Sequence, residues 1–170
     1  MKRSFFSIAL LLALAAPGII SAQTAAQGDP TMIAVFPLKN LYDDAQYDDL
    51  IWSYADSLVS YLNTKEGAGK TFAILPMDDL RDQMLAQNID PNSPSYETDV
   101  FKILKLLGAR KVVWGTYLVK YEKANIELKI LDAKTLMADQ KHMANKIRAP
   151  YAEALSTVAS AGDKLLPGLP

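Results

Sequence analysis

The chain has 170 residues, a formal net charge of −1 at pH 7, one histidine and no cysteine. This length fits one domain with a substantial core, and the absence of cysteine excludes disulfides and thiol chemistry. A nearly balanced charge argues against nucleic acid or an anionic membrane surface as the main partner.

Residues 1–22 are predicted to be a signal peptide. Lys2 and Arg3 precede an apolar segment at residues 5–16, and Ala22 offers a small-residue cleavage site. The apolar segment is shorter than the ~20 residues that a membrane-spanning helix needs. No later stretch is long and apolar enough, so we expect no transmembrane span after cleavage.

The predicted localisation is the periplasm. A bacterial lipoprotein carries its lipid on a cysteine directly after the signal, and this chain has none. We therefore predict an exported protein that is cleaved near Ala22 and is not a lipoprotein. Removal of the signal takes away Lys2 and Arg3, which leaves 16 basic against 19 acidic residues and a net charge of about −3.

The polar residues 23–31 are expected to form a flexible leader to a single domain at residues 32–166. The almost continuously apolar residues 32–37 predict a strand that is buried on both faces. Residues 39–46 read as a polar loop. Apolar side chains at intervals of three and four predict a helix over residues 46–63.

A second short buried strand is predicted at residues 71–75, followed by a helix at residues 76–87. Residues 88–96 carry two prolines and form the longest irregular stretch after the leader, so they are a candidate for contact with a partner. Residues 97–107 have apolar side chains on one side and predict a third helix, which Gly108 would end.

The strongest strand signal lies at residues 111–121 and 125–132, which predict an antiparallel hairpin with the link at residues 122–124. Residues 136–147 alternate poorly and predict an exposed edge strand. A closing helix should begin at Pro150. These elements predict an α/β (α+β) fold, with helices packed on a mixed parallel and antiparallel sheet.

Five short segments carry a resemblance to a known superfamily. They are IAVFPL at residues 33–38, YADSL at 54–58, LGAR at 107–110, VVWGTY at 112–117 and LDAKT at 131–135. In this order the chain resembles the superfamily of TolB amino-terminal-like domains over residues 32–147. That superfamily includes CsgG-like proteins of curli secretion, flagellar FlgO-like proteins and outer-membrane activators of penicillin-binding proteins.

The resemblance implies a TolB amino-terminal-domain-like fold and a non-catalytic domain that docks onto other envelope proteins. Three departures limit it. The chain lacks the long amphipathic hairpins that a curli-type pore inserts into the membrane. It lacks the lipobox cysteine of the lipoprotein members, so any attachment to the outer membrane would depend on a partner. It also has Leu136 where a glycine often follows the LDAKT turn.

No pattern of catalytic or cofactor-binding residues is convincing. Residues 67–71, GAGKT, lack the first glycine of a phosphate-binding loop and would follow a helix rather than a strand. His142 is the only histidine, which argues against a catalytic triad or a transition-metal site and favours an exposed residue on the edge strand. We predict no catalytic residue, no cofactor and no metal.

Two acidic clusters stand near predicted helix starts, where carboxylates favour the helix dipole. That structural role is the first interpretation, and calcium binding or carboxylate-dependent hydrolysis are the alternatives. The clusters are Asp43, Asp44, Asp48 and Asp49, and Asp78, Asp79 and Asp82.

The leading hypothesis is a non-catalytic periplasmic adaptor that binds other cell-envelope or flagellar proteins, either by adding its edge strand to a partner's sheet or through its loop face. The alternatives are an activator of a peptidoglycan synthase and a carboxylate-dependent periplasmic hydrolase. Self-association into a homo-oligomer stays open. The residues predicted to contact a partner are Trp52, Val59, Asp90, Asn92, Tyr96, Asp139, Lys141 and His142.

Overall fold

A six-stranded mixed sheet organises the chain in this computed structural model, which describes residues 28–42 and 44–170. The strand order is β3-β1-β4-β5-β6, and β2 pairs with β4 off this path. The strands are β1 Thr31–Val35, β2 Lys39–Asn40, β3 Phe72–Ile74, β4 Lys111–Lys120, β5 Lys123–Asp132 and β6 Ala138–Pro150. The helices are α1 Asp49–Asn63, α2 Met77–Ala86, α3 Tyr96–Ile103 and α4 Val158–Leu165, with short 3-10 turns at Ala45–Tyr47, Tyr151–Thr157 and Leu166–Gly168.

The two halves of the sheet differ in direction. β1 lies parallel to β3 and to β4, and β2 is also parallel to β4. β5 pairs antiparallel with β4 on one side and with β6 on the other. Helices lie on both faces, so the predicted fold class, helices packed on a mixed sheet, is confirmed.

The β4–β5 hairpin is the longest regular ladder, and it pairs without interruption from Lys111 opposite Asp132 to Lys120 opposite Lys123. Its turn consists of Tyr121 and Glu122, with φ of +53° and +58°. Two successive positive φ values match the type I′ turn that suits the twist of a hairpin. The predicted link at residues 122–124 was therefore too long and began one residue late.

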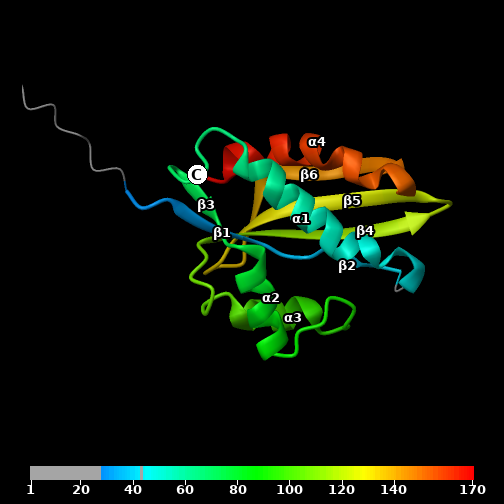
Figure 1. Cartoon of the computed structure of the whole chain (residues 1–170), viewed down its shortest axis with the longest axis horizontal. Coiled ribbons are helices and arrows are strands. Elements are labelled where there is room, and N and C mark those ends of the chain that lie inside the picture. The colour runs from blue at the N-terminus through cyan, green and yellow to red at the C-terminus, as the bar shows by residue number, and fades with distance from the viewer. Residues whose placement is uncertain (1–27, 43) are drawn as a thin grey trace, which may run out of the picture.

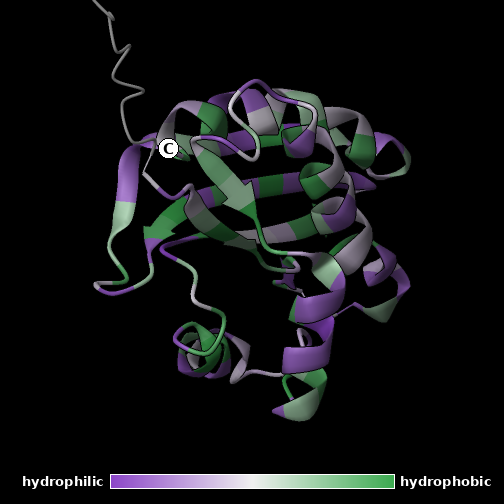
Figure 2. Cartoon of the chain, turned by 60° about the vertical axis from the view of Figure 1, so that its left-hand side comes forward, coloured by the Kyte–Doolittle hydropathy of each residue, from purple (hydrophilic) through white to green (hydrophobic). Residues whose placement is uncertain are grey.

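Alternation along the hairpin sends its side chains to two different cores. Val113, Tyr117 and Ile126 belong to the larger cluster, with α1 and α4, whereas Val112 and Trp114 belong to the smaller cluster, with α2 and α3. Figure 1 shows α1 and α4 along one face of the sheet and α2 and α3 on the other. Hydrophobic and hydrophilic residues alternate along the strands in Figure 2.

Three further expectations can be compared with the structure. The predicted loop at residues 39–46 contains β2, whose two residues continue the parallel sheet beside β4. The predicted edge strand is β6, which pairs only with β5 and extends to Pro150. The closing helix begins as a 3-10 turn, and its α-helical part starts at Val158.

Within the described ranges, no helix combines the length and the apolar character that crossing a membrane requires. The predicted signal peptide, residues 1–22, and most of the predicted leader lie outside those ranges.

Candidate functional site

The face of the sheet that carries α2 and α3 is covered at one end only. Those helices pack on Val112, Trp114 and Leu131, near the start of β4 and the end of β5. Figure 1 shows the β4–β5 hairpin reaching past α2 and α3. The remaining side chains of this face are exposed or half-buried, and we call them the open face. Strand register places on it Thr116, Leu118, Lys120, Lys123, Asn125, Glu127, Lys129, Met143, Arg148 and Pro150.

Strand register explains why these side chains lie together. Thr116 is opposite Glu127, and Asn125 is opposite both Leu118 on β4 and Arg148 on β6. Directly opposed residues in an antiparallel pair point to the same side of the sheet, and every second residue along a strand does so too. Lys129 and its neighbour Met143 extend the same surface.

Positive charge dominates the open face. Its four basic side chains are those of Lys120, Lys123, Lys129 and Arg148, and its one acidic side chain is that of Glu127. None of these five forms an ion pair with another residue of the described chain. A protein with a formal charge of −1 thus presents an excess of positive charge on one surface.

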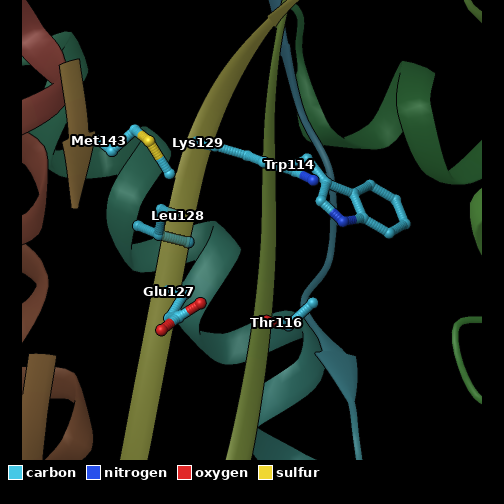
Figure 3. A pocket seen from close by; sticks show the side chains of 6 residues that line it. All are labelled: Trp114, Thr116, Glu127, Leu128, Lys129 and Met143. Carbon is cyan, nitrogen blue, oxygen red and sulfur yellow. The ribbon is translucent and has the colours of Figure 1, made fainter. Parts of the chain in front are cut away.

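The open face is shallow. A hollow in it has a volume of about 80 Å³ and is lined by residues of three strands. Figure 3 shows the Lys129 side chain extending from β5 towards Trp114 on β4, with Glu127 and Thr116 further along the hairpin. Pockets that hold small molecules measure roughly 300–1,000 Å³. The geometry therefore suits contact with a macromolecule better than enclosure of a small substrate.

Two of the predicted partner-binding residues require correction. Tyr96 is fully buried, where it stacks on Trp114 at 5.0 Å between ring centroids and its hydroxyl donates to the Pro37 carbonyl at 2.8 Å. Burial raises the pKa of Tyr96, which keeps the hydroxyl protonated as a donor. Val59 is also buried, within the α1 side of the core. Their side chains cannot reach a partner.

The other predicted residues form small groups at the surface. Trp52 is half-buried and lies under the Arg81 guanidinium, which is 4.7 Å from its ring centroid. Asn92 is exposed. Its backbone amide donates to the Asp90 carboxylate, and its side-chain amide donates to the Asp48 carboxylate at 2.9 Å. Trp52 and Asn92 are therefore held by contacts inside the chain.

The β6 group is held by a local turn. The Asp139 carboxylate accepts the Lys141 amide at 2.9 Å and lies 2.7 Å from Nδ1 of His142. The hydrogen bond with His142 is the main reason why the pKa of Asp139 is lowered. No hydrogen bond or ion pair in the described structure joins this group to Asp90 or Asn92, so the predicted residues do not form one site.

The edge of β6 is poorly suited to strand addition. Its pairing with β5 shifts register twice, and Lys146 has a φ of +56°. Bulges of this kind bend an edge strand and interrupt the ladder that an incoming strand would need. The open face is therefore the better candidate for the docking surface.

The first acidic cluster serves local structure, and in the second Asp78 pairs with Arg81 at 3.5 Å and lies with Asp79 in the first turn of α2. Asp44 accepts the Gln46 amide at the start of the first 3-10 turn, and Asp48 accepts side-chain amides of both Asn40 and Asn92. Asp49 accepts the Tyr151 hydroxyl. Asp43 lies outside the described residues. Within the described ranges, no group of three or more potential ligand side chains could hold a metal ion.

The sequence matches no protein-family model and no curated protein. Solved structures share the fold. A lipoprotein of Neisseria meningitidis, GNA1162, is 15% identical with a TM-score of 0.50, over 81% of this chain and 97% of that protein. Escherichia coli LpoB is 11% identical with a TM-score of 0.50, over 86% of this chain and 83% of that protein. Identities this low show a common fold and nothing finer.

The comparison overturns the predicted localisation. We predicted a periplasmic protein that is not a lipoprotein, whereas the structural neighbour from Neisseria meningitidis is a lipoprotein. The fold thus occurs in proteins that a lipid tethers to a membrane. The physical reason for the error is that the absence of cysteine bears only on lipid attachment through a cysteine. It does not determine where a protein resides.

Proposed function

We propose that this protein is a non-catalytic accessory protein of the cell envelope that binds a protein partner through its open face. The observation that carries the proposal is half a sheet face without helical cover, which bears four cationic side chains and the half-buried Leu118. Apolar and charged side chains side by side are usual at a protein-binding surface.

A protein partner fits this surface better than a small substrate does. The hollow of the open face, at about 80 Å³, is too small to enclose a substrate, and its charged side chains lie on the strands rather than converging on one point. Of the carboxylates that a hydrolase would use, Asp44, Asp48 and Asp49 are engaged in a helix start and in loop contacts. These features support a protein-binding role that involves no catalysis.

Among envelope partners, a peptidoglycan synthase is the one that we favour, with this protein as its activator. Two lines support this choice: the fold shared with LpoB, and the sequence resemblance to a superfamily that includes activators of penicillin-binding proteins. The excess of positive charge on the open face calls for an acidic surface on the partner.

The test is glycan polymerisation by a purified peptidoglycan synthase, with and without this protein. We expect an increased rate, and we expect the double variant K129E/R148E to lose the increase because two cations of the open face become anions. The control is K70E, a charge reversal at an exposed position outside the open face. It should retain the increase.

Binding should be measured alongside the rate, for example by interferometry with the immobilised synthase. Binding without a rate increase would retain the docking role and reject activation. If the wild-type protein neither binds nor activates synthases from the cell envelope, the choice of partner is wrong. If K129E/R148E and K70E behave alike in a complex that does form, the open face is not the docking surface.

A further inference from the structure

A second concentration of positive charge lies at the opposite end of the β4–β5 hairpin from its turn. A pocket of about 350 Å³ is formed there by the end of the α3 segment, the start of β4 and the turn after β5. Its lining residues are Leu104, Lys105, Gly108, Ala109, Arg110, Ala133 and Lys134. The volume lies within the range of roughly 300–1,000 Å³ that is typical of small-molecule sites.

The three cations of this pocket, Lys105, Arg110 and Lys134, are exposed side chains that form no ion pair with a described residue. Cations that share one pocket repel each other, and a bound anion relieves this repulsion. The positive charge of the pocket therefore attracts anions.

The carboxylate of the adjoining hollow is already engaged. Asp132 lines an adjoining hollow with Arg110 and Lys134, and its Oδ1 accepts the amides of Lys134 and Thr135 as well as the Thr135 hydroxyl. These hydrogen bonds from Thr135 are the main reason why its pKa is lowered. Even with Asp132 counted, three cations face one anion, which leaves a net charge of +2.

The backbone that carries the cations is firmly held. The Arg110 amide donates to the Met32 carbonyl at 2.8 Å, and the Arg110 carbonyl accepts the Ala133 amide at 2.9 Å. Arg110 is thereby fixed between β1 and the turn after β5. Gly108, with a φ of +63°, provides the left-handed residue that turns the chain from α3 into β4. A fixed backbone reduces the entropy that ligand binding would cost.

We propose that this pocket binds a small organic dianion, such as a phosphate monoester, with its charged group on Arg110, Lys105 and Lys134. A guanidinium offers paired donors that match two oxygens of a phosphate, and two ammonium groups complete the neutralisation. Leu104, Ala109 and Ala133 provide apolar contact for the organic part. This site is separate from the open face and does not depend on the proposed docking function.

The test is a titration of the isotope-labelled protein with phenyl phosphate and with inorganic phosphate, followed by nuclear magnetic resonance. Near pH 7.5 both probes carry close to two negative charges, since their second pKa is about 6–7. We expect saturable shifts of amides at residues 104–110 and 132–135, with phenyl phosphate binding at least about threefold more tightly, because its ring adds apolar contact.

Two variants separate the pocket from general charge effects. R110Q/K134Q should weaken phenyl phosphate binding by about tenfold or more, because it removes two cations while Gln keeps most of each side chain's length. K123Q/K129Q, which removes the same charge from the open face, should bind as the wild type does. Unchanged spectra away from the substituted positions would show that both variants are folded.

Several outcomes would overturn the proposal. These are shifts that chloride reproduces at equal ionic strength, shifts that fail to saturate at about 20 mM phenyl phosphate, and equal weakening by the two double variants. Because the readout is binding at residues 104–110 and 132–135, failure here would leave the synthase experiment unaffected.

Discussion

The two faces of the sheet show how one hairpin can serve both stability and recognition. On one face, α1 and α4 cover the side chains of β4 and β5 along the whole hairpin, from Ile130 to Ala124. On the other, α2 and α3 cover only the end with Trp114 and Leu131. The same two strands therefore have one fully buried face and one half-open face.

This difference predicts which substitutions should affect stability and which should affect docking. A side chain in the covered face is surrounded by close-packed neighbours, so its loss leaves a cavity. A side chain of the open face has solvent as a neighbour, so its replacement should affect stability little and docking more.

The largest effect is expected from Leu58→Ala. Leu58 lies on α1 with 1% of its surface exposed, inside the larger cluster. Removal of a buried leucine side chain beyond Cβ should lower the free energy of unfolding by about 2–5 kcal/mol. Urea unfolding followed by circular dichroism measures the loss.

The matched variant is Leu118→Ala, the same deletion on the half-buried position of the open face. We expect it to cost less than about 1 kcal/mol, since part of its surface is already in contact with water. Equal losses for Leu58 and Leu118 would show that the open face is covered, and the contrast between the faces would not hold.

A second effect is expected from added volume on the covered face. A Cβ at Gly115 would lie 2.3 Å from Cδ2 of Leu128 and 2.3 Å from Cδ2 of Leu38. Both side chains would have to move, so Gly115→Ala should destabilise the protein by about 1–3 kcal/mol. Gly28→Ala is the control, because a Cβ there would meet no atom within 4 Å. A neutral Gly115→Ala would indicate that this layer is loosely packed.

A third effect concerns the covered end of the half-open face. Tyr96→Phe removes the hydrogen bond to the Pro37 carbonyl but keeps the ring that stacks on Trp114. The cost should be about 1–2 kcal/mol, because a buried carbonyl loses its donor. Tyr121→Phe, at a side chain that is 85% exposed, should change stability by less than about 0.5 kcal/mol. A loss of docking by Tyr96→Phe at full stability would contradict its placement in the core.

Tyr96 also shows how far the sequence could predict this structure. Long periodic segments were predicted well, namely α1, the β4–β5 hairpin and the mixed sheet, because their apolar spacing repeats over many residues. Tyr96 follows a loop that is rich in Pro and Ser, and local pattern places it at the surface. Its burial depends on Trp114 and Pro37, which are distant in sequence, and no local pattern encodes such contacts.

Only the β5 part of the open face could be predicted from the sequence. Asn125, Glu127 and Lys129 alternate with apolar residues, and this pattern predicts one solvated side of β5. What the sequence did not supply is the register that brings Arg148 of β6 beside Asn125, because β6 carries two register shifts. A bulge reverses the facing of every later residue, so the members of β6 on the open face could not be assigned from alternation.

The smallest effect is expected at the exposed edge, from Asp139→Asn. The folded-state pKa of Asp139 is lowered below its ordinary value of 3.8, chiefly by the hydrogen bond with His142. A lowered pKa means that the carboxylate contributes stability above pH 3.8, and that this contribution is lost as the pH falls through the folded value. The wild type should therefore exceed Asp139→Asn slightly at pH 7, and the difference should shrink below pH 3.8.

Unfolding in urea at pH 7 and at about pH 3 measures this difference. Three other carboxylates with lowered pKa, Asp99, Asp132 and Asp163, also lose stabilisation in acid. They are present in both proteins and cancel in the comparison. In a His142→Ala background the effect of Asp139→Asn should become smaller, because its main partner is absent. An undiminished effect there would assign the lowered pKa to the backbone amides of Lys141 and residue 142 instead.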